Sequence, residues 1–237
     1  LNAERNYSNN LNENYQVSDR DYLALNTNEF GIFGISTILI KTAFSGGDGT
    51  VNKNFQNFRN NRLIIANRLA AQNGTSINNR VENGYPEGFN KNHQTVLVAS
   101  FLSAYSGSDP NKISFDPIQN TPLPNWNLNY TGLPKIKSLA KIFNRFSLTH
   151  GYRSSYTLTN YQTNLEYDSN QPLAKDAVGN YMTSKFYSNI NLAEQFNPLI
   201  RLDVEFKNSL KILAEIKRDR SLSLSLDNSL LTEQSGN

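Results

Sequence analysis

The chain of 237 residues contains no cysteine and only two histidines. The absence of cysteine excludes disulfide bonds, thiolate metal ligands and a cysteine nucleophile. His93 and His150 lack the acidic or histidine neighbours that a metal or catalytic site requires. Asp48 and Asp109 belong to no spaced array of oxygen ligands, and the glycine-rich segment 45–49 lacks the lysine of a phosphate-binding loop and is predicted as a turn. The sequence therefore predicts no enzyme, no metal site and no cofactor.

Long apolar runs are also missing. No stretch of about 18 apolar residues is present, so the sequence predicts no membrane-spanning helix. Hydrophobic residues make up 38% of the chain, and the mean hydropathy is -0.56. These values are compatible with a β-barrel, because barrel strands alternate between apolar and polar residues and keep the average low.

Charge of one sign is not in large excess. The chain has 23 basic and 20 acidic residues and a formal net charge of +3. Without a clustered basic patch, this balance predicts no nucleic-acid partner. The sequence opens at Leu1 without an initiator methionine and without a signal segment of basic and then apolar residues. We expect the chain to be a segment of a longer protein.

Two β-hairpins are predicted between Leu199 and Leu226. A three-residue loop at 207–209 would pair Glu205 with Lys211, and a second loop at 218–220 would place Lys211 between Glu205 and Asp227. One face of this sheet is predicted to contact lipid and carries Ile200, Leu202, Val204, Phe206, Leu210, Ile212, Ile216, Leu222, Leu224 and Leu226. The other face is predicted to line a water-filled lumen and carries Arg201, Asp203, Glu205, Lys211, Glu215 and Lys217.

This pattern allows two interpretations. An apolar face opposite a charged face is typical of one layer of a soluble sandwich and also of a barrel wall, whose strands need roughly 9 to 11 residues. The alternating run at 146–158 favours the barrel, because it is long and has one aromatic face and one hydroxyl-rich face. Another strand is predicted from Ile190 to Phe196, with Pro198 marking a turn or the start of the next strand.

The first half of the chain shows little such alternation. Apolar spacing predicts helices over 54–72 and 94–105, and residues 30–44 are predicted as a strand or a buried extended segment. We therefore predict a loop-rich region with short helices at 1–120, on the extracellular or lumen side. Antiparallel barrel-wall hairpins are predicted to follow at 121–237.

Residues 133–146 alternate lysines with isoleucines, leucines and phenylalanines. One interpretation is a short interfacial helix between two strands. The other is a basic connection whose apolar residues pack on the rim of the sheet.

A series of short phrases resembles the C-terminal part of the SprA/Sov family. Two of these phrases are P-L-P-N-W at 122–126 and F-S-L-T-H-G-Y-R-S at 146–154. The ordered series is much more specific than any single phrase. The other phrases lie at 33–37, 55–59, 66–70, 101–107, 130–133, 193–200 and 206–210.

Members of this family are giant outer-membrane translocons of the type nine secretion system in Bacteroidetes, and they are also required for gliding motility. The resemblance implies an all-β fold, namely a segment of a very large antiparallel transmembrane β-barrel with loop and short-helix insertions. It implies a pore that exports folded proteins carrying a C-terminal secretion signal. The implied partners are the rest of the barrel, a PorV-type partner barrel, a periplasmic plug protein, secreted cargo proteins and membrane lipid, all at the bacterial outer membrane.

Two alternatives stay open on the sequence. The first is a fragment of a TonB-dependent receptor barrel, which would share the barrel wall but have a plug domain and a gated site for a small ligand. The second is a soluble β-sandwich adhesin or carbohydrate-binding module, in which Trp126 and the strand tyrosines would stack on sugar.

Overall fold

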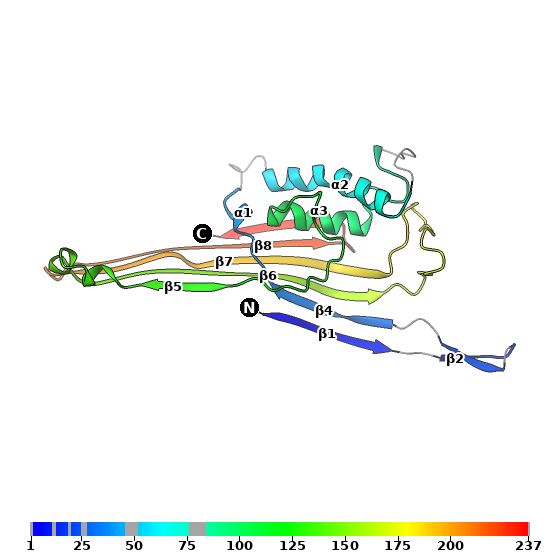
Figure 1. The fold of residues 1–237 in the computed structure, drawn as a ribbon, viewed down its shortest axis with the longest axis horizontal. Coiled ribbons are helices and arrows are strands. Elements are labelled where there is room, and N and C mark those ends of the chain that lie inside the picture. Colours follow the sequence, from blue (N-terminus) through cyan, green and yellow to red (C-terminus); the bar gives the residue numbers. More distant parts are fainter. Residues whose placement is uncertain are drawn as a thin grey trace.

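The computed structural model describes residues 2–10, 13–18, 20–24, 28–45, 52–75 and 84–236. Its main element is a seven-stranded sheet with the strand order β1-β4-β6-β7-β8-β9, in which β5 also pairs with β6 (Figure 1). Every named pair is antiparallel, as predicted. The strands are β1 (Ala3–Asn10), β4 (Asn28–Ser36), β5 (Trp126–Tyr130), β6 (Phe143–Thr163), β7 (Lys185–Phe206), β8 (Lys211–Ser225) and β9 (Leu230–Gly236), and a separate hairpin contains β2 (Glu13–Gln16) and β3 (Asp21–Ala24).

Helices cover one face of the sheet along only part of its length. The α-helices are α1 (Ile40–Ala43), α2 (Lys53–Gln72) and α3 (Gln94–Ser106). The predicted helices at 54–72 and 94–105 are thereby confirmed. None of the helices in the described part of the chain is both long enough and apolar enough to cross a membrane. Of the predicted turn at 45–49, residues 46–49 lie outside the described residues, and Asp48 lies there too.

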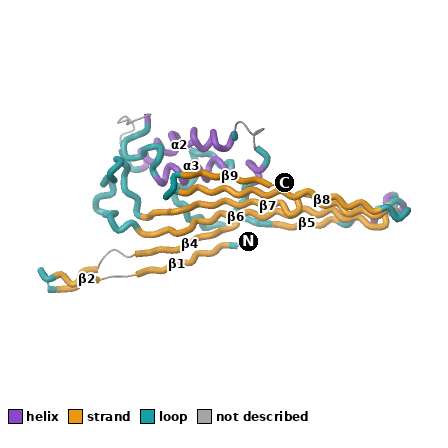
Figure 2. The backbone as a smooth tube through the Cα atoms, turned by 180° about the vertical axis from the view of Figure 1, so that it is seen from behind, coloured by secondary structure: helices purple, strands orange, loops and turns teal. Residues whose placement is uncertain are grey.

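The hydrophobic core lies between the sheet and α3. Phe101 and Tyr105 of α3 pack against Tyr156 of β6, Leu192 of β7 and Leu222 of β8, and all five are buried. A second cluster joins α2 to α3 on the side away from the sheet. The helices therefore form two layers, with α3 against the strands and α2 outside it (Figures 1 and 2).

The helices α1, α2 and α3, which together we call the helical layer, lie between β4 and β5 in the sequence. These two strands continue one another along a single edge of β6. Strands β4 and β5 both pair with the same edge of β6, Ser36 opposite Ser155 and Trp126 opposite Tyr152. The backbone N–H of Leu123 donates to the carbonyl of Ser36 at 2.9 Å. The chain thus leaves the sheet after Ser36 and returns beside the same residue at Leu123. The first half of the chain also supplies β1 and β4 to the sheet. The prediction had placed the strands of the sheet after residue 120 only.

Four strands continue past the helices to a narrow tip. We call this part the projecting end, and it comprises residues 126–130 of β5, 143–150 of β6, 199–206 of β7 and 211–217 of β8. Figures 1 and 2 show it extending away from α1, α2 and α3. The tip is formed by the loop at 207–209 and by two 3-10 turns, η2 (Leu133–Lys135) and η3 (Leu139–Lys141). Of the two interpretations of residues 133–146, the interfacial helix is wrong beyond these short turns, because β6 begins at Phe143.

Two sequence predictions about strand ends are also wrong. Strand β8 runs through Arg218–Arg220 without a turn, and Asp227 lies in the later turn before β9. Strand β7 likewise continues through Pro198, where the pairing with β8 shifts between Phe196 and Ile200. The shift accommodates proline because the strand pairing that would need its missing N–H is interrupted there.

Gly151 lies where β6 approaches the backbone of β7. A Cβ atom added at Gly151 would come within 2.6 Å of the carbonyl oxygen of Asn197, whereas at Gly34 the nearest contact would be 3.9 Å from the Thr157 Oγ1. We expect Gly151→Ala to lower the free energy of unfolding by about 1–3 kcal/mol, because the two strands must move apart. Gly34→Ala should cost less than about 0.5 kcal/mol. Urea denaturation of both variants checks this, and equal costs would contradict it.

His93 is buried at the start of α3. Its Nδ1 accepts from the N–H of Thr95 at 3.2 Å, and its Nε2 lies 3.1 Å from the carbonyl oxygen of Tyr181. These contacts suit a neutral ring that caps the helix and donates through Nε2. Burial lowers the pKa of His93 from 6.5 to about 4. These contacts give His93 a structural role. They do not test the prediction that it has no catalytic or metal-binding role.

Stability is expected to fall in mild acid because of His93. Below its ordinary pKa the unfolded chain takes up a proton that the folded chain excludes, so stability decreases as the pH falls. The expected loss is about 2 kcal/mol between pH 7 and pH 5. His93→Asn keeps a capping oxygen and should remove this part of the pH dependence. Unfolding curves at several pH values check it, and an unchanged pH dependence in the variant would show that His93 is not its source.

Candidate functional site

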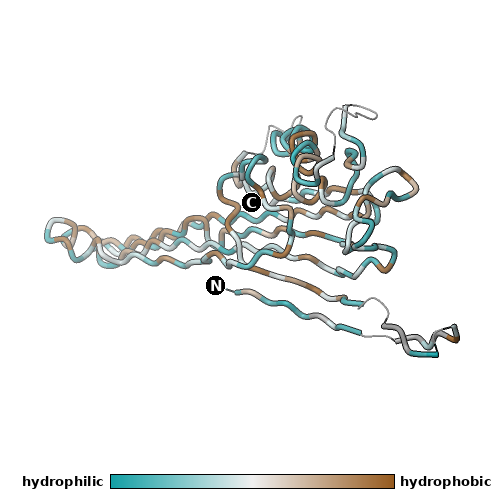
Figure 3. Tube along the Cα trace, turned by 45° about the vertical axis from the view of Figure 1, so that its right-hand side comes forward, coloured by the Kyte–Doolittle hydropathy of each residue, from teal (hydrophilic) through white to brown (hydrophobic). Residues whose placement is uncertain are grey.

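The projecting end has the strand register that its sequence predicts. Ile200 pairs with Ile216, Val204 with Ile212, and Glu205 with Lys211. The N–H of Phe206 donates to the carbonyl of Leu210 across the loop at 2.9 Å. Because side chains alternate along a strand, apolar residues gather on one face and charged residues on the other. Figure 3 shows this alternation of hydropathy along the strands.

The apolar face of the projecting end is largely uncovered. Ile200, Ile212 and Ile216 are 49%, 43% and 57% exposed. The face continues across four strands and includes Leu128, Leu148, Ile200, Leu202, Val204, Phe206, Ile212, Ala214 and Ile216. A contiguous exposed apolar surface of this kind marks a contact with lipid or with another protein.

The helices cover the continuation of this same face. Along β8, Ile216 and Leu222 lie on one side because their spacing is even and β8 contains no bulge. Ile216 is exposed, whereas Leu222 and Leu224 are 0% and 3% exposed in the core beneath α3. The predicted lipid contact is therefore wrong for Leu222 and Leu224. It is also wrong for Leu226, which packs against the same core.

The other predicted lipid-facing residues have different degrees of exposure. Leu210 is exposed, whereas Leu202 and Phe206 are half-buried. Val204 is only 4% exposed, so it presents almost no surface to lipid and that prediction is wrong. Its partners in register, Phe146 on β6 and Ile212 on β8, flank it on this face.

Ion pairs connect neighbouring strands on the opposite face. Arg145 Nη2 lies 2.9 Å from Asp203 Oδ1, and Lys211 Nζ lies 3.9 Å from Glu205 Oε2. Glu215 Oε1 is 4.0 Å from Arg201 Nη1 and 3.8 Å from Lys217 Nζ. All six residues predicted to face the lumen share this side with Arg145. Each exposed pair is worth about 0–1 kcal/mol, so the pairs indicate a wet surface more than a source of stability.

Aromatic rings lie at both ends of the exposed apolar face. At the tip, the ring centroids of Phe143 and Phe206 are 5.3 Å apart, and those of Phe143 and Phe146 are 6.0 Å apart. Next to the helices, Trp126 stacks on Tyr152 at 4.5 Å. The second cluster also includes Phe44 and Phe196, at 5.4 Å, and Tyr152 and Phe196, at 5.0 Å.

The outer edges of the projecting end have no partner among the described strands. Strand β9 pairs with β8 only from Asp219 to Ser225, so residues 211–218 of β8 keep one free edge. On the other side, β5 pairs only with β6. Backbone N–H and C=O groups at such edges are available to pair with further strands.

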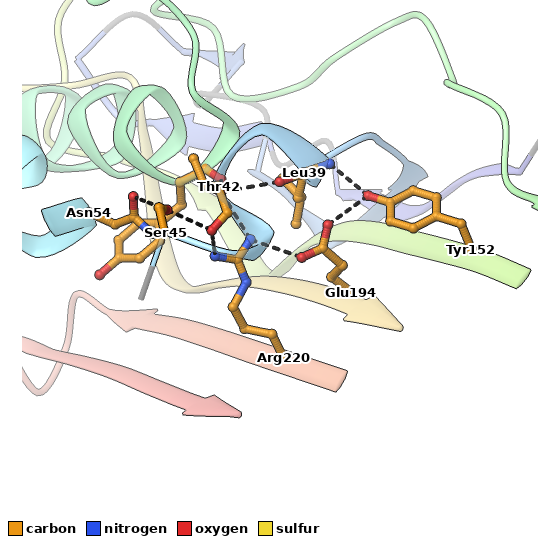
Figure 4. Close-up of polar contacts among 8 residues, drawn as sticks. Leu39, Thr42, Ser45, Asn54, Tyr152, Glu194 and Arg220 are labelled. Atoms are coloured by element: carbon orange, nitrogen blue, oxygen red, sulfur yellow. Dashed lines mark hydrogen bonds and ion pairs between the residues drawn. The ribbon is translucent and has the colours of Figure 1, made fainter. Parts of the chain in front are cut away.

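A buried polar network lies where the helices meet the projecting end (Figure 4). Arg220 Nη2 of β8 lies 3.0 Å from Glu194 Oε2 of β7. The hydroxyl of Tyr152 donates to Glu194 Oε1 at 2.9 Å and accepts from the N–H of Leu39 at 2.8 Å. Arg220 also donates to the Thr42 carbonyl oxygen and Oγ1, at 2.8 and 3.0 Å.

This network attaches the helical layer to the sheet. It joins three strands to the segment around α1, and the Thr42 hydroxyl also hydrogen-bonds to the Tyr105 carbonyl of α3. Burial raises the pKa of Glu194, and the charge of Arg220 opposes that rise. Sequence reasoning did not find the network. A signal was present, because Glu194 and Arg220 are opposite charges at apolar-face positions of two neighbouring strands.

Several other candidate residues have structural contacts. His150 Nδ1 lies 2.7 Å from the Leu199 carbonyl oxygen, and Asp109 accepts from the N–H of Asn111 within its own turn at 2.9 Å. Tyr152 and Tyr156 are buried and therefore unable to stack on a sugar. Within the described ranges, no three His, Asp or Glu side chains gather closely enough to hold a metal ion.

No protein-family model matches the chain, and a search of curated proteins finds no match.

Proposed function

We propose that this chain is a section of the wall of a large outer-membrane pore of the SprA/Sov type, which exports folded proteins. The apolar face of the projecting end would contact lipid, and the ion-paired face would contact water in the pore. The observation that carries the proposal is the single apolar face of β6, β7 and β8. The helices bury this face at Leu222. At Ile216, where no helix covers it, the face is exposed and still apolar.

The dimensions of the bare face support a membrane environment. Residues 210–218, which comprise Leu210 and the first part of β8, lie between the two aromatic clusters, and eight extended steps of about 3.4 Å give a length of about 27 Å. At a strand tilt of about 40° this corresponds to a height of about 21 Å. Barrels in outer membranes have an apolar band about 25 Å tall between two aromatic girdles.

The free edges support a wall that continues on both sides. In hydrocarbon, an unpaired backbone N–H or C=O has no water to bind, so open sheet edges do not occur there. Residues 211–218 of β8 and the outer edge of β5 would therefore pair with further barrel strands. The PorV-type barrel, the plug protein and the cargo belong to the proposal through the family resemblance alone.

Loop lengths support one orientation across the membrane. Outer-membrane barrels have short periplasmic turns and longer extracellular loops. The projecting end closes with the three-residue loop at 207–209 and the connection at 131–142, both shorter than the segment 164–184 that joins β6 to β7 at the opposite end. We therefore place the tip toward the periplasm and the helical layer toward the cell exterior.

Blocking the pore from its ion-paired face tests the export function. The chain has no cysteine, so Lys217→Cys provides the one thiol of this section for a bulky polyethylene-glycol maleimide, in cells that export a folded reporter. Modification should stop export of the reporter. Modification of Lys112→Cys, in an exposed turn after α3, should leave export unchanged. Continued export after complete modification of Lys217→Cys would contradict the proposal.

A further inference from the structure

The tip of the projecting end carries basic and apolar side chains together. Residues 131–142 contain three lysines and no acidic residue, and Lys207 of the neighbouring loop adds a fourth. The N–H of Lys207 donates to the Ile142 carbonyl at 3.0 Å, which fixes the two segments side by side. None of these lysines forms an ion pair with a described residue, because the acidic groups nearby, Asp203 and Glu205, pair with Arg145 and Lys211.

Two isoleucines of this segment are exposed. Ile136 and Ile142 are 47% and 49% exposed, whereas Leu133 and Leu139 are half-buried. Ile142 directly precedes Phe143, whose ring lies in a cluster with Phe146 and Phe206. Exposed isoleucines beside unpaired lysines are the composition of a surface that enters the boundary between acyl chains and headgroups.

We propose that η2, η3 and the loop at 207–209 form a binding surface for anionic phospholipid headgroups. This inference rests on the proposed membrane position of the projecting end. Ile136 and Ile142 would enter the edge of the acyl layer, while Lys135, Lys137 and Lys141 would contact lipid phosphates. The occupant is a phospholipid of the leaflet next to the short turns, and the charge complementarity of four unpaired lysines identifies it as anionic.

Quenching of tryptophan fluorescence by brominated lipids measures this preference directly. Trp126 is the only tryptophan in the chain, so Trp126→Phe with Ile142→Trp places a single reporter at the tip. The protein is placed in vesicles of equal parts phosphatidylcholine and phosphatidylglycerol, with the bromine carried first by one lipid and then by the other. We expect phosphatidylglycerol to associate with the reporter at least about fivefold more strongly.

Removal of the lysines gives the matched comparison. Lys135→Gln, Lys137→Gln and Lys141→Gln together should bring the ratio of association constants to about one. Lys53→Gln, Lys91→Gln and Lys112→Gln change the net charge equally in and around the helical layer and should leave the ratio unchanged. Equal association of both lipids in the unsubstituted tip would overturn the proposal. So would a preference that is lost only with the helical-layer substitutions, because the anionic lipid would then lie at the opposite end.

A reporter in the middle of the apolar face separates this proposal from the function on which it rests. Leu128→Trp with Trp126→Phe should be quenched by both brominated lipids equally. Quenching there without quenching at Ile142→Trp would overturn the headgroup site alone. Absence of quenching at both positions would overturn the membrane position itself.

Discussion

Arg220→Met is expected to lower the free energy of unfolding by about 3–5 kcal/mol, because it leaves the Glu194 carboxylate buried without its cation. The two groups are 3.0 Å apart, and both side chains are almost inaccessible to solvent. The loss should depend on pH. Burial already raises the pKa of Glu194 and Arg220 opposes that rise, so the variant should raise it further. A buried carboxyl with a raised pKa destabilises the fold only while it is ionised. The loss of stability caused by Arg220→Met should therefore become smaller as the pH falls and Glu194 is protonated.

Two further variants make this result specific. Arg218→Met removes the same charge two residues away, where Arg218 lies 4.8 Å from the ring centre of Phe44, and it should cost about 1 kcal/mol or less. The double variant Glu194→Gln with Arg220→Met should recover most of the loss, because no charge stays buried. Chemical denaturation at neutral and acidic pH measures all three. An equal loss for Arg218→Met and Arg220→Met would contradict the role of the buried pair.

Ala214→Arg is expected to destabilise the membrane-inserted protein by about 2–4 kcal/mol, because it places a charge near the middle of the face proposed to contact lipid. Leu213→Arg, one residue earlier on the ion-paired face, should stay within about 0.5 kcal/mol. Both positions are exposed, so steric fit does not separate them. Refolding into lipid vesicles in urea measures the two changes. Similar small values for both would indicate water on both faces.

The register of the first hairpin was predictable because three local constraints coincide. The loop at 207–209, the apolar pairs and the opposite-charge pair of Glu205 with Lys211 all select one alignment. A shift by one residue would break the last two together. The helices at 54–72 and 94–105 were predictable for a similar reason, since their apolar spacing is regular over three or more turns.

The second predicted hairpin failed at a charged triplet that resembles a turn. Arg218, Asp219 and Arg220 interrupt the apolar alternation, yet the strand continues because Arg220 finds Glu194 on β7. That partner lies 26 residues earlier in the sequence and is brought close only by the completed register. The correct strand end therefore depended on a tertiary contact that local patterns do not contain.

The sequence also did not predict that helices cover one part of the apolar face and leave the other part exposed. Ile216 and Leu222 are equivalent in alternation and in side-chain type, and their surroundings differ because the excursion of the chain between Ser36 and Leu123 places α3 over Leu222 and leaves Ile216 bare. That excursion begins and ends beside Ser36. Sequence patterns alone do not show that the segments before and after it are neighbours. Pairing of β4 and β5 with a common edge of β6 is needed to see it.

Nitroxide scanning along β8 tests the central claim most directly. Each position from 211 to 217 is changed to cysteine in turn, which the cysteine-free chain permits, and is labelled in lipid vesicles. Collision rates are measured with oxygen, which concentrates in lipid, and with a water-soluble nickel complex. The account predicts that oxygen dominates at 212, 214 and 216 and that nickel dominates at 211, 213, 215 and 217. Strong nickel contact at Ile212, Ala214 and Ile216 would contradict it.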